Sequence, residues 1–305
     1  MTPKGSRIVW GVMLGIPLLG LPGFAQNSAP QAPGAKVLIV TTLGMTPYQQ
    51  AVKGLALKLA LGGAKPSEVE LPPEGSEILL AAALQNGPFK VIVAVGPEAR
   101  WSLGRANVKV PVVSTMLFLS DLDEEAAQSR ALPANLAASV YLDPNPEDIA
   151  HQLRQALPSL ASVGIIVPSM QNGTALASAL FKSKFQVKVV ECARSADLVK
   201  TFLALRNKVD FVLALPIPKL YNSSTIGELL KASLDHHLPV VGFSESFVQA
   251  GAMAGVYAPY EELGSQTGDM VLKLASGVKS IEDETPRRLT VKTNQKVLRL
   301  LGRNL

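Results

Sequence analysis

Short apolar runs alternate with segments of helical apolar spacing in two successive series, and this alternation constrains the fold more than any other feature of the chain. The runs are 36–42, 67–71, 90–95 and 110–115 in the first series and 161–167, 186–190, 210–215 and 239–243 in the second. Their Val, Ile, Leu and Ala residues mostly lack polar alternation, which is typical of parallel strands covered on both faces. The sequence therefore predicts an α/β protein with two doubly wound parallel-sheet lobes.

The segments between these runs have the spacing of amphipathic helices. We expect helices at 47–61, 75–85, 97–104, 147–157, 174–181, 195–206, 225–236 and 259–275. The helix at 147–157 follows a short strand at 136–142 and the segment Asp143-Pro-Asn-Pro, whose Asp and Asn residues predict a helix cap. We place a first crossing between the lobes at this point.

The N-terminus has the pattern of an export signal. Lys4 and Arg7 precede an apolar stretch at 8–21, and the small residues at 23–25 fit a signal-peptidase site. We therefore predict a signal peptide at 1–25, followed by a disordered leader at 26–35 that is rich in Pro, Ala, Ser and Gln. An uncleaved anchor is the weaker alternative, because Gly and Pro interrupt an apolar stretch that is too short to span a membrane.

Composition narrows the possible partners and chemistry. The net charge of +5 is small and dispersed, so we expect no nucleic-acid partner. Cys192 is the only cysteine, which leaves no disulfide and no N-terminal thiol for a lipid anchor. The predicted location is thus the periplasm, without lipid attachment. Three histidines, and no nucleotide-binding, P-loop or nucleophile-elbow motif, predict no metal, no cofactor and no enzymatic activity.

One continuous stretch carries a family resemblance. The segment LPVVGFSESFVQAGAMAGVY at 238–257, followed by APYEELGSQTGDMVLKLASG at 258–277, reads as strand, polar loop, short helix, strand and amphipathic helix. In an exported α/β chain this pattern resembles the extracytoplasmic substrate-binding proteins of ABC transporters, in particular the tryptophan/tyrosine-type branch.

The resemblance implies a periplasmic-binding-protein fold of type 1, with two lobes joined by a hinge. The helix at 259–275 would return the chain to the first lobe. We therefore expect lobe 1 at 36–138 plus about 257–280, and lobe 2 at 139–256 plus about 281–305.

Loops that follow parallel strands at the carboxyl edge of an open sheet are where such folds bind ligands. Six loops meet this condition, three in each predicted lobe, and most contain hydroxyl groups, Gly or Pro. The candidate ligand-binding residues on these loops are Thr42, Gly44, Thr46, Tyr48, Gly96, Pro97, Glu98, Ser114, Thr115, Met116, Ser169, Met170, Asn172, Pro216, Ile217, Ser244 and Glu245.

Each candidate also has a structural interpretation. Thr46 and Ser114 could cap the helices that follow them, and Tyr48 could be the apolar entry of its helix. Glu245 could meet a cationic ligand group or cap its own helix. The pair Gly96-Pro97 indicates a close backbone approach, either to a ligand or to a neighbouring helix.

The chain departs from the family pattern at one position. Many relatives have Leu-Pro-Asp after the strand that matches 210–215, whereas this chain has Leu-Pro-Ile with Ile217. If that aspartate meets a cationic ligand group in the family, its replacement by Ile217 removes an anchoring charge for an amino-acid ligand. An apolar or uncharged solute fits a cleft predicted to be lined by Met45, Tyr48, Met116, Met170 and Ile217 at least as well.

These patterns predict a monomeric binding protein that closes on a small molecule between its lobes and delivers it to an ABC permease. The alternative keeps the fold and presents the closed form to a sensor kinase or receptor. A third possibility is an enzyme built on the same fold.

Overall fold

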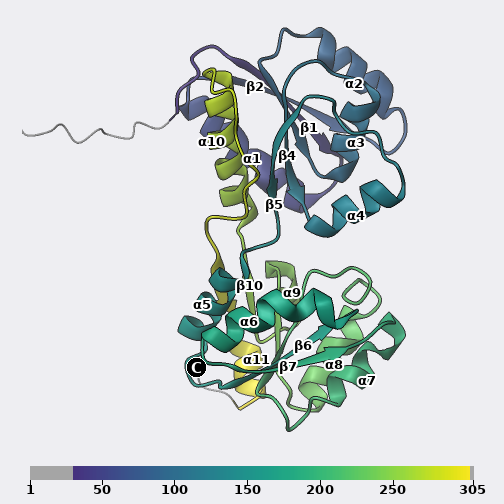
Figure 1. Ribbon diagram of the computed structural model, residues 1–305, viewed down its shortest axis with the longest axis vertical. Coiled ribbons are helices and arrows are strands. Elements are labelled where there is room, and N and C mark those ends of the chain that lie inside the picture. The colour runs from purple at the N-terminus through teal and green to yellow at the C-terminus, as the bar shows by residue number, and fades with distance from the viewer. Residues whose placement is uncertain (1–29, 303–305) are drawn as a thin grey trace, which may run out of the picture.

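The computed structural model describes residues 30–302, and it shows two lobes stacked along the long axis of the molecule (Figure 1). The predicted signal peptide and the first part of the predicted leader lie outside the described residues. No helix within 30–302 has the length and apolarity to cross a membrane.

The first lobe contains a five-stranded parallel sheet in the order β2-β1-β3-β4-β5. Its strands are β1 (Lys36–Thr42), β2 (Lys65–Leu71), β3 (Val91–Val95), β4 (Val112–Leu117) and β5 (Leu136–Tyr141). Its helices are α1 (Thr46–Leu61), α2 (Ser76–Gln85), α3 (Pro97–Arg105), α4 (Leu119–Ala127) and α10 (Tyr260–Ala275). Apart from α4, which the sequence did not predict, these elements lie close to their expected positions.

The second lobe repeats this topology. Its sheet order is β11-β10-β9-β8-β6-β7, and all neighbours are parallel except β10 and β11. The strands are β6 (Ser162–Val167), β7 (Gln186–Glu191), β8 (Phe211–Leu213), β9 (Val240–Gly242), β10 (Ala254–Tyr257) and β11 (Thr290–Thr293). The helices are α5 (Pro146–Ala156), α6 (Thr174–Lys182), α7 (Leu198–Leu203), α8 (Ile226–Asp235), α9 (Glu245–Ala250) and α11 (Gln295–Leu300), with 3-10 turns at Met170–Gly173 and Ser195–Asp197.

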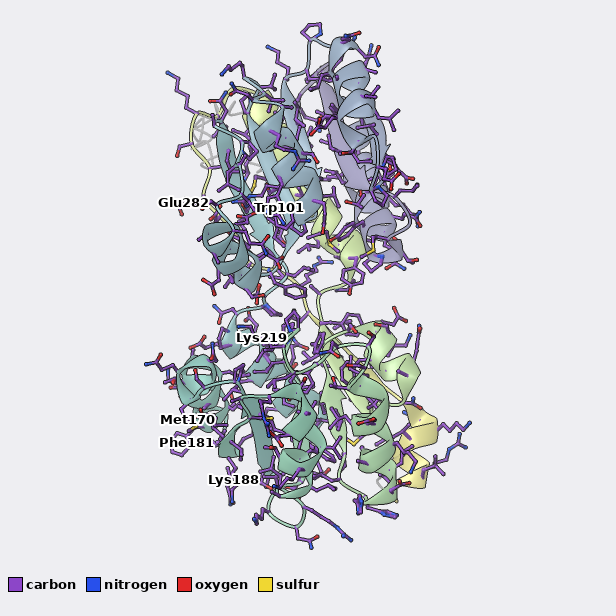
Figure 2. The ribbon with its side chains drawn as sticks, turned by 90° about the vertical axis from the view of Figure 1, so that its right-hand side faces the viewer. Trp101, Met170, Phe181, Lys188, Lys219 and Glu282 are labelled. Carbon is purple, nitrogen blue, oxygen red and sulfur yellow. The ribbon has the colours of Figure 1, made fainter. Side chains whose placement is uncertain are left out.

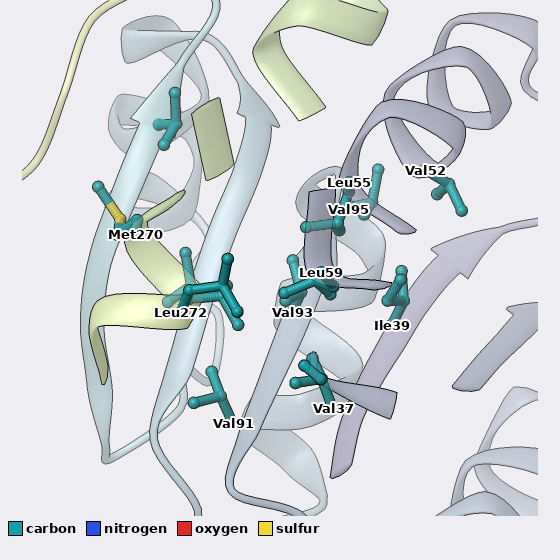
Figure 3. Close-up of a cluster of buried hydrophobic side chains, with 14 of the residues drawn as sticks. Val37, Ile39, Val52, Leu55, Leu59, Val91, Val93, Val95, Met270 and Leu272 are labelled. Carbon is teal, nitrogen blue, oxygen red and sulfur yellow. The ribbon is translucent and has the colours of Figure 1, made fainter. Parts of the chain in front are cut away.

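Each sheet is covered on both faces, as the apolar runs predict. In the first lobe, one face packs against α1 and α10 (Figure 3) and the other against α2 and α3. In the second lobe, α5, α6 and α11 cover one face and α7, α8 and α9 the other. These four apolar clusters each stay within one lobe, so each lobe has a core of its own. The predicted fold class is confirmed.

Helices α1 and α10 come closer together than most helices can. A Cβ added to Gly264 would lie 1.8 Å from the carbonyl oxygen of Ala51, and one added to Gly54 would lie 1.9 Å from that of Glu261. Glycine is therefore required at both positions, because backbone atoms of the facing helix occupy the space of a side chain. This contact fastens α10, which comes late in the chain, to the first lobe.

The chain passes between the lobes three times. Residues 142–145 leave β5 for α5, residues 258–259 lead from β10 into α10, and residues 288–289 lead into β11. Glu284 forms a parallel bridge with Val140 at the edge of the first sheet, and Glu282 lies on the first lobe in Figure 2. We propose these crossings in place of the boundaries at 138 and about 280, because strand pairing keeps 139–141 and 283–284 with the first sheet.

The leader also ends earlier than expected. Ala32 and Ala35 are buried in the first-lobe core, and the amide of Ala32 donates to the carbonyl of Gly62 at 2.9 Å. Residues 32–35 therefore belong to the first lobe, whereas the sequence suggested disorder there. Their small side chains fit against the end of α1, which composition alone does not reveal.

Candidate functional site

Both sheets have the strand order that creates a topological switch point. In the first lobe it lies between β1 and β3, and in the second between β6 and β8. The loops after these strands diverge to opposite faces of the sheet and leave a crevice at its carboxyl edge. The predicted loops after residues 42, 95, 167 and 213 are those at the two switch points.

A groove of about 440 Å³, here called the first-lobe groove, lies at the first switch point. It gathers three of the predicted residues, Thr42, Tyr48 and Glu98, together with Met45. The sequence did not identify the remaining polar and aromatic side chains of its lining, which are Ser76, Trp101, Ser102, Arg105 and Arg130. Trp101 can be located on the first lobe in Figure 2.

Tyr48 joins the lining of this groove to the first-lobe core. Its ring packs against the first-lobe core, and Gly96, with φ +90°, approaches it so closely that an added Cβ would lie 2.6 Å from the ring. The close approach expected at Gly96-Pro97 is thus to a neighbouring helix, because Tyr48 belongs to α1. Burial, and then the negative charge of Glu98, raise the pKa of Tyr48, so its hydroxyl stays protonated.

Charges in the groove are partly compensated. The guanidinium of Arg130 lies 4.5 Å from the ring centroid of Trp101, and Arg105 contacts Glu77 at 3.4 Å. Among the described residues, Glu98 forms no ion pair. The groove is lined by residues of the first lobe alone.

A second cavity, of about 260 Å³, lies where the chain crosses between the lobes, and we call it the crossing cavity. Phe118, Leu142 and Tyr260 come from first-lobe elements or their ends. The second lobe, with the chain that leads into and out of it, supplies the rest of the lining, which is Pro144, Ile149, Leu213, Ala214, Leu215, Pro216, Phe243, Ser244, Ser246, Val256, Tyr257 and Ala258. Of the predicted residues, Pro216 and Ser244 are here. Both lobes therefore form this cavity.

The ends of the second-lobe strands position this lining. The side chain of Ser244 accepts a hydrogen bond from the amide of Phe247 at 3.2 Å and so caps α9. The loop after β8 turns back through Ile217, whose amide donates to the carbonyl of Leu215 at 2.7 Å. Lys219, two residues further on, lies at the end of the second lobe nearest the first lobe in Figure 2.

Several predicted residues lie in neither cavity. Ser114, Thr115 and Met116 are buried because β4 extends to Leu117, so their side chains belong to the sheet and not to a loop. Thr115 contacts Thr267 of α10, with 3.0 Å between their hydroxyl oxygens. Gly44 and Thr46 lie in the turn into α1 and at its first residue, and the side chain of Thr46 does not cap that helix.

The remaining candidates make contacts within the second lobe. The hydroxyl of Ser169 donates to Asn172 at 2.6 Å, and Met170 lies exposed on the flank of the second lobe (Figure 2). Ile217 packs against both second-lobe cores. Glu245 forms an ion pair with Lys292 of β11, so its carboxylate already has a cationic partner.

The four aromatic residues that line the crossing cavity were missed, namely Phe118, Phe243, Tyr257 and Tyr260. A signal for them was present, since Phe243 and Tyr257 stand directly after or at the end of short apolar strands. Rings at strand ends line this cavity as well as hydroxyl groups. In the described part of the chain, no group of three or more His, Cys, Asp or Glu side chains is placed to hold a metal ion.

Comparisons with known proteins agree with this architecture. Residues 74–302 match the family model described as ABC transporter substrate binding protein. The ligand-free, open structure of a substrate-binding protein with adhesive properties from Clostridium difficile has a TM-score of 0.66 at 18% identity, covering 89% of this chain and 96% of that one.

Two further solved structures have the same fold. A domain from Streptococcus pneumonia in complex with L-Trp has a TM-score of 0.56 at 16% identity, covering 88% and 95% of the two chains. A conserved domain protein from Vibrio cholerae has a TM-score of 0.58 at 19% identity, covering 89% and 95%. No curated protein gives a significant match.

Proposed function

Because the chain belongs to the family of ABC transporter substrate-binding proteins, we propose that it captures a small solute between its two lobes and delivers it to an ABC permease. The observation that carries this proposal is the crossing cavity, whose wall comes from both lobes. A guest that touches both lobes stabilises the arrangement in which they enclose it, and the population shifts toward closure by the difference in affinity.

The three crossings are short enough to act as the hinge. Residues 283–287 do not add to its length, because Asp283 accepts hydrogen bonds from the amide of Ser139 at 2.7 Å and the hydroxyl of Tyr141 at 3.0 Å. The side chain of Gln266 also donates to Glu284 at 2.7 Å. Only a few backbone dihedrals at 142–145, 258–259 and 288–289 are left to absorb the rotation of one lobe against the other.

We also propose that the protein acts in the periplasm, free of a lipid anchor, after removal of residues 1–25. The export pattern around Lys4 and Arg7 and the position of Cys192 support this location. The N-terminal sequence of the exported protein checks it, with Gln26 as the expected first residue. We likewise propose that the protein binds its solute without turnover, which the family membership supports.

Substitutions in the two walls of the crossing cavity test solute capture. Phe118→Ala truncates the wall on the first-lobe side and Phe243→Ala the wall on the second-lobe side. Each should weaken the affinity for the solute that co-purifies with the protein, identified by mass spectrometry, by tenfold or more, because buried rings dominate such contacts. Isothermal titration calorimetry measures the change.

Phe181→Ala is the matched control, since Phe181 is 74% exposed on the flank of the second lobe (Figure 2). It should leave the affinity unchanged. Equal affinities in all three variants would contradict solute capture in the crossing cavity. Co-purification with a permease would support delivery of the solute to a transporter. The alternative, presentation of the closed form to a sensor kinase or receptor, uses the same lobe closure but predicts a different partner.

A further inference from the structure

Four aromatic rings form much of the wall of the crossing cavity. Phe118 follows β4, Phe243 follows β9, Tyr257 ends β10 and Tyr260 begins α10. Phe243 contacts two further rings, Tyr221 edge-on at 6.4 Å and Phe247 in a tilted arrangement at 5.2 Å. The rings thus come from both lobes, and Phe243 packs against two further rings.

No charged side chain occurs among the described residues that line this cavity. Glu245, between the lining residues Ser244 and Ser246, forms its ion pair with Lys292. Asp143, between Leu142 and Pro144, accepts a hydrogen bond from the amide of Leu119 at 2.6 Å. The two nearest acidic residues in the sequence therefore have partners within the protein.

The polar groups of the lining are neutral hydroxyls. Burial raises the pKa of Tyr257 and of Tyr260, so both remain protonated. The hydroxyls of Ser244 and Ser246 lie 2.9 Å apart. Such groups can hydrogen-bond an uncharged polar atom, but they do not balance a full charge.

From these contacts, and building on the proposed solute capture, we infer that the guest of the crossing cavity is a flat, uncharged ring compound. The ring stacks against aromatic side chains from both lobes, and one or two neutral polar atoms meet the hydroxyls. A cation, an anion or a zwitterion would lose its hydration there without an ionic partner. The cavity size of about 260 Å³ suits a guest of one or two rings.

A set of four probes with the same ring and different charge tests this inference. Indole is neutral, tryptamine is a cation, indole-3-acetate is an anion and L-tryptophan is a zwitterion. Indole should raise the melting temperature and bind at least tenfold more tightly than each charged probe in calorimetric titrations. Equal or tighter binding of a charged probe would overturn the inference while leaving solute capture intact.

Absence of binding by all four probes would also overturn the inference. Solute capture itself would then be judged separately, by the co-purified solute and by the Phe118→Ala and Phe243→Ala variants. The two failures are thus distinguishable.

Placing a charge in the cavity provides the converse experiment. Ser246 is an exposed residue in the first turn of α9, where an acidic side chain is compatible with the helix. Ser246→Asp should raise the affinity for tryptamine at least tenfold and lower that for indole. Gln249→Asp adds the same charge to the same helix away from the lining and should change neither the affinity for tryptamine nor that for indole. A gain in affinity for tryptamine that is equal in both variants, or absent from both, would contradict the inference.

Discussion

Gly96 shows how a single residue holds the first-lobe groove in shape. Its φ of +90° disfavours any side chain, and the ring of Tyr48 occupies the space of a Cβ. Gly96→Ala should lower the free energy of unfolding by about 3 kcal/mol, because backbone strain and overpacking add. Urea denaturation measures the loss.

Gly75→Ala separates these two contributions. Gly75 has a comparable φ of +74° but no atom within 4 Å of an added Cβ, so it should lose only the strain energy, about 1–2 kcal/mol. The Tyr48→Ala background should likewise reduce the effect of Gly96→Ala. Equal losses in Gly96→Ala and Gly75→Ala would show that the Tyr48 ring yields to the new methyl group.

At the same scale, the candidate residues could be predicted only in part. Strand ends led to Thr42, Tyr48, Glu98, Pro216 and Ser244, which line the two cavities, and their contact with a ligand stays a prediction. The predicted set also included Ser114, Thr115 and Met116, because the sequence does not indicate that β4 continues two residues further. When a strand extends by two residues, the side chains of those residues belong to the sheet and its core instead of a loop.

Among the elements, α1 and α10 join chain segments about 200 residues apart. The carbonyl oxygen of Ala51 would lie 1.8 Å from a Cβ at position 264. The two helices would therefore have to move apart if a methyl group were added. Gly264→Ala should therefore destabilise the protein by about 3 kcal/mol, at the upper end of overpacking effects. Thermal unfolding followed by circular dichroism measures it.

Gly227→Ala is the matched control, since Gly227 is also helical, in α8, and has open space around it. There the substitution should stabilise the protein by up to about 1 kcal/mol, because Ala favours the helix. Stabilisation by Gly264→Ala as well would mean that α10 can move away from α1 without loss.

Elements were predicted well where a pattern is local and long, and poorly where a distant partner forms the element. The alternation of apolar runs gave both sheets and most helices. Strand β11 is four residues long and depends on antiparallel pairing with β10, more than thirty positions earlier in the chain. The helix α4 is short, and five of its nine residues are Asp, Glu or Ser, so its apolar spacing is weak.

For the whole molecule, the separation of the four apolar clusters into two lobes has a thermodynamic consequence. Each lobe has its own core, and three short crossings connect them, so the lobes can unfold as separate units. Differential scanning calorimetry of the ligand-free protein should resolve two transitions. A bound solute that touches both lobes should bring these transitions together, because it is lost when either lobe unfolds.

One substitution in each core assigns the transitions. Gly264→Ala should lower the transition of the first lobe, and Phe185→Ala, which removes a fully buried ring in edge contact with Phe211 at 5.9 Å, should lower that of the second by an amount equivalent to about 3–5 kcal/mol. A single transition that both variants shift equally would mean that the lobes unfold together. The crossings would then transmit stability between the lobes, and the hinge would be stiffer than closure on a small guest requires.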